Sequence, residues 1–271
     1  MRLAAAASAR LSPALGAALL EGVFRYVHRH PVPARERDWL AAAERSHLEL
    51  AGRRLPVWSW GAGPAVLLVH GWAGRGSQMG AFAAPLAAAG FRAVAFDGPG
   101  HGAAPGRLSS LPSLIDAVMA VGAAVGPLAG LVAHSAGAAA STVAMGRGLV
   151  VPAAVFAAPA ANPPRYLDLV RRWLGLPAET TARTRRRIET RFHVRFEDLD
   201  ACRIAPRLGA PLLVFHDRRD AEVPWQEGST LAASWPGARF VSTDDLGHHR
   251  ILRDEAIVTE AVRFLTAARG A

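Results

Sequence analysis

The chain has 271 residues, half of them apolar, with a formal net charge of +9 and one cysteine. This length and apolar fraction allow a large hydrophobic core and exclude an intrinsically disordered chain. Cys202 alone excludes an internal disulfide framework and is typical of a reducing compartment, so we expect a cytoplasmic protein.

All 31 basic residues are arginines, in a sequence rich in alanine, glycine and proline. This pattern indicates a GC-rich coding bias more than selection for nucleic-acid binding. No basic motif interleaved with aromatics and no zinc-finger spacing is present, so we expect no nucleic-acid partner. A positive field would still favour an anionic substrate.

Residues 1–27 are rich in alanine and leucine, but Arg10, Glu21 and Arg25 interrupt them. No run reaches the roughly 20 apolar residues that a membrane helix needs, which predicts no integral membrane span. Arg10 and Pro13 also break the apolar region of a signal peptide, whereas the lack of early acidic residues would suit a transit peptide. We expect residues 1–47 to form a helical N-terminal extension.

Leu11, Leu15, Leu19 and Phe24 form an apolar stripe on this extension if it is helical. We expect the stripe to pack on the core or on a second copy of the chain, which would give a homodimer. Attachment to a membrane surface is the alternative.

A helix is predicted from residue 34 to 47, followed by two short strands around Gly52 within residues 48–60. The run 65–69 is wholly apolar, as in a strand covered on both faces. Further strands are predicted at 91–96, 128–133, 153–157, 211–215 and 238–241, and helices at 76–89, 111–125, 136–147, 226–234 and 251–268. This alternation predicts an α/β fold with a mostly parallel, doubly covered sheet.

The alternation fails between Pro159 and Pro206, where arginines and aromatic residues are mixed. We interpret residues 160–205 as an inserted helical lid and residues 48–159 with 206–271 as the core. The lid arginines would suit a carboxylate-bearing or CoA-linked substrate. A solvated helix face with some ion pairs is the simpler interpretation.

A possible nucleophile lies where the apolar run 128–133 stops at His134-Ser135 and a small-residue run follows. This pattern predicts a buried strand, a sharp elbow and a helix, with the serine projecting above the carboxyl edge of the sheet. The usual spelling of the elbow is G-x-S-x-G, and here Ala133 occupies the first position.

A nucleophilic serine needs donors for the oxyanion, and His70-Gly71-Trp72-Ala-Gly follows the strand 65–69. We assign this role to the N–H groups of Trp72 and Ala136. We expect His70, Gly71 and His134, beside them, to contact the substrate.

The orienting acid is expected on the loop after strand 211–215, where Asp217, Asp220 and Glu222 compete. Asp220 has the best placing, Asp217 is the alternative, and Glu222 is expected at the surface. The base is expected after strand 238–241, where His248 follows a glycine and His249 is the alternative.

The chain order Ser135, Asp220, His248 resembles that of the α/β-hydrolase superfamily. The resemblance covers the chain past about residue 48 and includes Asp97-Gly-Pro-Gly-His-Gly102, similar to that family's D-x-P-G-x-G loop. Departures are Ala133, a variant also found in some bacterial lipases, and the N-terminal extension.

The resemblance implies a serine hydrolase that cleaves a carboxylic ester or thioester of a small-molecule acyl substrate. The same triad serves C–C hydrolases, amidases and acyltransferases, and the fold also serves as a non-catalytic ligand receptor. No H-E-x-x-H motif, cysteine cluster or P-loop is present, so we expect no metal and no cofactor.

Overall fold

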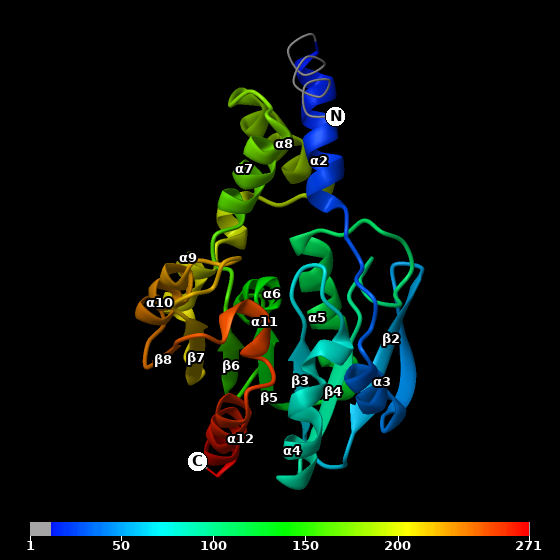
Figure 1. Ribbon diagram of the computed structural model, residues 1–271, viewed down its shortest axis with the longest axis vertical. Coiled ribbons are helices and arrows are strands. Elements are labelled where there is room, and N and C mark those ends of the chain that lie inside the picture. The colour runs from blue at the N-terminus through cyan, green and yellow to red at the C-terminus, as the bar shows by residue number, and fades with distance from the viewer. Residues whose placement is uncertain (1–11, 271) are drawn as a thin grey trace.

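The computed structural model describes residues 12–270, which form an eight-stranded sheet with helices on both faces (Figure 1). The strands are β1 (Glu44–Leu50), β2 (Arg53–Trp60), β3 (Ala65–Val69), β4 (Arg92–Phe96), β5 (Leu128–His134), β6 (Ala154–Ala157), β7 (Leu212–Asp217) and β8 (Arg239–Thr243). Their order is β1-β2-β4-β3-β5-β6-β7-β8. The strands from β4 to β8 pair in parallel, and β2 is antiparallel to both β1 and β4. The α/β fold and its mostly parallel sheet are as the sequence predicts.

Two apolar layers cover the sheet. One contains α5 (Leu111–Val125), α6 (Ala136–Gly146), α9 (Ala201–Ile204) and α10 (Trp225–Ser234), and the other contains the 3-10 helix η1 (Gly76–Phe82), α4 (Ala83–Ala88) and α12 (Glu255–Arg269). Both faces of β3, β5, β6 and β7 are therefore buried, which explains their continuous apolar runs.

The predicted helix over 34–47 is too long. Helix α3 spans Ala34–Ala41, and β1 already begins at Glu44, inside the predicted extension. Residues 44–47 pair with β2 across a turn in which both Ala51 and Gly52 have positive φ. Ladder pairing with β2 therefore overrides the helical tendency of this polar stretch. The helix predicted over 251–268 begins only at Glu255 in the structure, as α12. A separate short helix, α11 (Gly247–Arg250), precedes it.

Between β6 and β7 the chain forms α7 (Pro163–Leu174), α8 (Glu179–Phe192), the 3-10 helix η2 (Phe196–Leu199), α9 and the 3-10 helix η3 (Ala205–Arg207). Figure 1 shows α7 and α8 standing beyond the strands together with the N-terminal helix α2 (Pro13–Arg25). Leu20 of α2 is fully buried in a small apolar cluster with Leu167 and Ile188. Helix α2 and helices α7 and α8 thus share one small core of their own.

The buried face of α2 differs from the predicted stripe. Ala17 and Leu20 are buried, whereas Leu15 is 56% exposed; Leu11 lies outside the described residues. Within residues 12–270, no helix is both long enough and apolar enough to cross a bilayer.

Glu21 is a buried acid that joins α2 to α8. Its carboxylate accepts hydrogen bonds from Arg25 (3.2 Å), Arg187 (3.0 Å) and Arg191 (2.6 Å). Burial raises the pKa of Glu21, but the hydrogen bonds from Arg191 and Arg187 outweigh burial and hold the pKa below its usual value. The charged carboxylate therefore stabilises the contact between the two helices.

Replacing Glu21 with alanine should loosen α2. Glu21→Ala leaves Arg187 and Arg191 without their acid, at an expected cost of about 1–3 kcal/mol because both arginines are half-exposed. Trypsin should then cleave after Arg25 several-fold faster than in the unaltered protein, as followed by mass spectrometry. Glu49→Ala, at an exposed position of β1, is the control. Equal cleavage rates in the two variants would contradict this role for Glu21.

Candidate active site

The turn from β5 into α6 brings two backbones very close together. Ser135 lies on this turn with φ 52° and ψ −123°, a strained conformation for a residue with a side chain. A Cβ added at Gly137 would lie 2.4 Å from the carbonyl oxygen of His70, and one at Gly71 would lie 2.8 Å from Ser135 Cβ. The two glycines therefore permit the sharp elbow that the sequence predicts. Ala133, in the position where the usual motif has glycine, fits fully buried in β5.

His248 and Asp220 are directly hydrogen-bonded. His248 Nδ1 lies 2.7 Å from Asp220 Oδ2, and the side chains of both residues are buried. The other oxygen of Asp220 accepts from the backbone N–H groups of Glu222 and Val223, both at 2.8 Å. Burial raises the pKa of Asp220, but the hydrogen bonds from His216 and His248 dominate and hold it far below its usual value. Asp220 therefore remains a carboxylate that fixes the orientation of the His248 ring.

The competing acids and the alternative histidine have other partners. Asp217 accepts from Thr243 Oγ1 (2.8 Å) and from the backbone N–H of Leu246 (2.9 Å), so it holds the loop that carries His248. Glu222 pairs with His249 at 2.9 Å, and both side chains are more than half exposed. Of the candidates named from the sequence, Asp220 and His248 are the acid and the histidine that the structure brings together.

Ser135 and His248 line one cavity of about 400 Å³, together with Trp72 and Ala136. The cavity is mostly apolar. The other lining residues are Val23, Phe24, Arg25, Ala73, Ser110, Leu111, Pro112, Ala139, Ala160, Pro163, Tyr166, Leu169, Val170, Ile188, Phe196, Leu199, Glu222 and Val223. Thus α2 and the segment between β6 and β7 both supply walls. None of the arginines of residues 160–205 lines this cavity.

The residues of the two predicted oxyanion donors, Trp72 and Ala136, line the same cavity. A turn closed by the N–H of Gly74 on the carbonyl of Gly71 (3.1 Å), with Ala73 at φ 54°, shapes the loop at Trp72. The backbone N–H of Trp72 has no hydrogen-bond partner within residues 12–270. Ala136 is the first residue of α6, so its N–H has no partner within the helix. Neither N–H group is therefore used by the regular secondary structure around it.

His70, Gly71 and His134, which the sequence suggests as substrate contacts, lie behind the cavity and do not line it. His70 is fully buried, and its Nε2 accepts from the N–H of Gly98 at 2.9 Å. His134 Nε2 lies 2.9 Å from the carbonyl oxygen of His248 and donates to it. His134 therefore fixes the backbone of the loop that carries His248. Gly71, which lacks a side chain, leaves space for the Cβ of Ser135.

Three further residues of the site escape the sequence analysis. Phe24 of α2 stacks on Trp72 with ring centroids 6.4 Å apart. The Tyr166 hydroxyl is buried in the cavity wall, and burial followed by the Glu227 carboxylate raises its pKa, so it stays protonated as a donor. His216 Nε2 lies 3.0 Å from the carbonyl of Val223 and 3.4 Å from Asp220 Oδ2. Of the three, only His216 could have been found from the sequence, because it directly follows a predicted strand, where the other polar residues of the site are also found.

Among residues 12–270, no three histidine, cysteine, aspartate or glutamate side chains are grouped so that they could hold a metal ion.

Comparison with known proteins agrees with this geometry. The model of the family described as Serine aminopeptidase, S33 matches residues 62–200, just over half of the chain. The chain therefore belongs to this hydrolase family, within the α/β-hydrolase superfamily. No curated protein matches the chain.

Solved structures with the same fold share about a fifth of their residues with this chain. Est1E from Butyrivibrio proteoclasticus, with ferulic acid bound, has 19% identity and a TM-score of 0.68, over 83% of this chain and 100% of that one. A membrane phospholipase A, described as a bacterial virulence factor, has 19% identity and a TM-score of 0.66, over 99% and 96%. A thermophilic esterase from Thermogutta terrifontis has 21% identity and a TM-score of 0.62, over 84% and 100%.

Buried histidines around the site should make the fold sensitive to acid. Burial lowers the pKa of His70 to about 4 and of His101 to about 3, and it lowers that of His134 well below 6.5. These groups stay neutral in the folded chain but bind protons in the unfolded chain below pH 6.5, so stability is lost as the pH falls. Asp97 has the opposite effect on stability. Burial raises its pKa to about 6, so as the pH falls the folded chain binds this proton at a higher pH than the unfolded chain does.

The free energy of unfolding should therefore fall by about 2 kcal/mol per pH unit on average between pH 7 and pH 5, as measured by urea unfolding. His101→Gln should flatten this slope, and His47→Gln, at an exposed position of β1, should not. A slope that His101→Gln leaves unchanged would refute the contribution of His101 to it.

Proposed function

We propose that this protein is a serine hydrolase that cleaves a carboxylic ester or thioester through an acyl-enzyme on Ser135. One observation carries the proposal: a serine held in a strained turn shares a cavity with a histidine that is 2.7 Å from a buried carboxylate. Membership of a hydrolase family agrees with the reaction class.

In this mechanism His248 takes the proton of Ser135 as the hydroxyl oxygen attacks the acyl carbon. His248 Nδ1 is bonded to Asp220, so Nε2 is the nitrogen left for the serine, and Asp220 stabilises the imidazolium that forms. The N–H groups of Trp72 and Ala136 would stabilise the oxyanion, a contribution of about 10²–10³-fold in turnover per donor. His248 then protonates the leaving group and later activates water for deacylation.

The cavity lining favours a neutral, apolar acyl group. Arg25, Glu222 and His248 are the ionisable residues besides Tyr166 among those that line it, and aliphatic and aromatic side chains form most of the wall. An ester with a short to medium acyl chain suits a volume of about 400 Å³. An anionic acyl group is less well supported, because the arginines of residues 160–205 lie elsewhere. The solved relatives named for a phospholipase A and for an esterase fit this substrate class.

In this proposal, residues 160–205 act as a lid over the core formed by residues 48–159 and 206–271. Ile188, Phe196 and Leu199 of that segment line the cavity with Ser135. The N-terminal extension completes the enclosure through Val23 and Phe24. Because Phe24 also stacks on Trp72, α2 supports the loop that supplies an oxyanion donor.

Substitution of the serine tests the reaction. Ser135→Ala should lower kcat for p-nitrophenyl butyrate by about 10⁴-fold or more, and Asp220→Asn by about 10⁴-fold. Ser141→Ala is the matched control, because Ser141 is buried on the same helix and its hydroxyl has no hydrogen-bond partner among the described residues. The control should keep full activity and should label with a fluorophosphonate probe, whereas Ser135→Ala should not.

Unchanged turnover in Ser135→Ala would end the proposal. An unaltered protein that neither reacts with the probe nor turns over any ester would favour a ligand receptor. Release of p-nitroaniline from an aminoacyl anilide in preference to ester cleavage would favour an amidase.

The contribution of α2 to the acyl site gives a separate expectation. Val23→Trp should fill the cavity and lower kcat/KM for p-nitrophenyl octanoate at least tenfold relative to the acetate, because each excluded methylene loses about 0.8 kcal/mol. Leu15→Trp, on the same helix but 56% exposed, should leave the ratio unchanged. Equal ratios in both variants would exclude α2 from the acyl site.

A further inference from the structure

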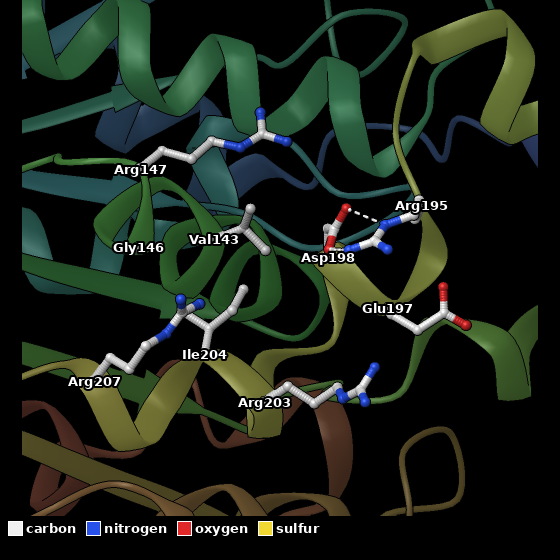
Figure 2. A pocket seen from close by; sticks show the side chains of 9 residues that line it. All are labelled: Val143, Gly146, Arg147, Arg195, Glu197, Asp198, Arg203, Ile204 and Arg207. Carbon is white, nitrogen blue, oxygen red and sulfur yellow. Dashed lines mark hydrogen bonds and ion pairs between the residues drawn. The ribbon is translucent and has the colours of Figure 1, made fainter.

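A second cavity, of about 800 Å³, lies at the other end of the nucleophile helix (Figure 2). Its walls come from the C-terminal end of α6, from η2 with the preceding residue, and from α9 and η3. The lining residues are Val143, Gly146, Arg147, Arg195, Glu197, Asp198, Arg203, Ile204 and Arg207. Along the helix axis, the residues of α6 and its C-cap that line this cavity lie about 12 Å (Val143) to about 18 Å (Arg147) from Ser135.

The acidic residues of this cavity are already neutralised. Asp198 accepts two hydrogen bonds from Arg195, at 3.0 Å and 2.9 Å, and Glu197 is paired with Arg185 of α8. The arginines lower the pKa of both carboxyls, chiefly through these hydrogen bonds, so both stay charged and occupied.

Three arginines remain. Within residues 12–270, the exposed side chains of Arg147, Arg203 and Arg207 form no ion pair and no hydrogen bond, although the charge of Arg147 acts on the Asp198 carboxyl. They come from three different elements, and Figure 2 shows them around the apolar pair Val143 and Ile204. All three side chains are exposed at the rim of this open cavity, so together they create a positive field that attracts an anion.

The arrangement suits phosphate better than a single carboxylate. Each guanidinium presents a planar fork of N–H donors, and one carboxylate can satisfy only one fork in a bidentate manner. Phosphate groups offer more oxygens and more charge, so they can engage several arginines at once. The volume lies in the range of small-molecule sites, and the accessible lining is mainly polar because Val143 and Ile204 are almost fully buried.

We propose that this cavity binds a phosphorylated small molecule, with its phosphate groups held by Arg147, Arg203 and Arg207. The site is separate from the cavity that contains Ser135, and its occupation does not depend on any hydrolase activity. Helix η2 lies between the two cavities, because Phe196 and Leu199 line the one and Glu197 and Asp198 line the other.

The experiment measures binding of inorganic pyrophosphate to the full-length protein by isothermal titration calorimetry in low-salt buffer. The unaltered protein should bind one equivalent. The triple variant Arg147→Gln, Arg203→Gln, Arg207→Gln should bind at least about tenfold more weakly, because charge-assisted hydrogen bonds are lost. Adenosine diphosphate should bind at least as tightly as pyrophosphate and should lose its binding in the same variant.

A control triple variant carries the same loss of charge at a distant place. Arg45→Gln, Arg53→Gln, Arg54→Gln changes exposed arginines of the β1–β2 hairpin, at the far edge of the sheet. This control should bind pyrophosphate within about twofold of the unaltered protein. Absence of binding, equal losses in the two triple variants, or a signal that survives in the site variant would overturn the proposal.

Circular dichroism and the urea midpoint establish that both triple variants are folded. If the site variant does not fold, the single substitutions Arg203→Gln and Arg207→Gln replace it. Each should weaken binding at least threefold if the site is as proposed. Unchanged affinity in both would refute the assignment.

Discussion

The whole site depends on the close crossing of β5, the loop after β3 and the first turn of α6. There Ser135 is forced to a positive φ, and the neighbouring backbones approach so closely that neither Gly71 nor Gly137 could carry a side chain. Strain of this kind persists only where the surroundings over-determine it. Here the surroundings are buried β-strands covered by helices on both faces, so the sheet core rigidly supports the strained turn.

A second set of contacts fixes the groups around that turn without facing the cavity. His134 donates to the carbonyl of His248, Asp217 holds the backbone after β8, and His216 approaches both Val223 and Asp220. Each of these residues lies at the end of a strand and is buried. Polar side chains at this edge therefore divide into those that face the cavity and those that hold the loops. Chemistry alone does not separate the two sets, because both consist of histidines and carboxylates.

This division also explains what the sequence could predict. Strand ends are readable from apolar runs, so residues such as Ser135, Asp220 and His248 could be expected at one edge of a parallel sheet, and the pairing of Asp220 with His248 was anticipated. The orientation of side chains behind that edge was not readable, and His70 and His134 were expected at the substrate. The contribution of α2 was equally hidden, because a helix that precedes the sheet in sequence gives no sign of where it docks. The helix predicted over 34–47 is correct over Ala34–Ala41 but too long for a related reason, because the pairing of Glu44 with Ser59 is a tertiary contact.

The N-terminal helix has an evolutionary consequence. The region that matches the family model begins at residue 62, well after Phe24, and ends before His248. Part of the wall of the cavity that contains Ser135 therefore comes from residues outside the region that matches the family model. Proteins grouped together on that region could carry unrelated leading helices and accept different molecules, so grafting a leading segment from one homologue to another would be a direct way to exchange selectivity while the strained turn is inherited unchanged.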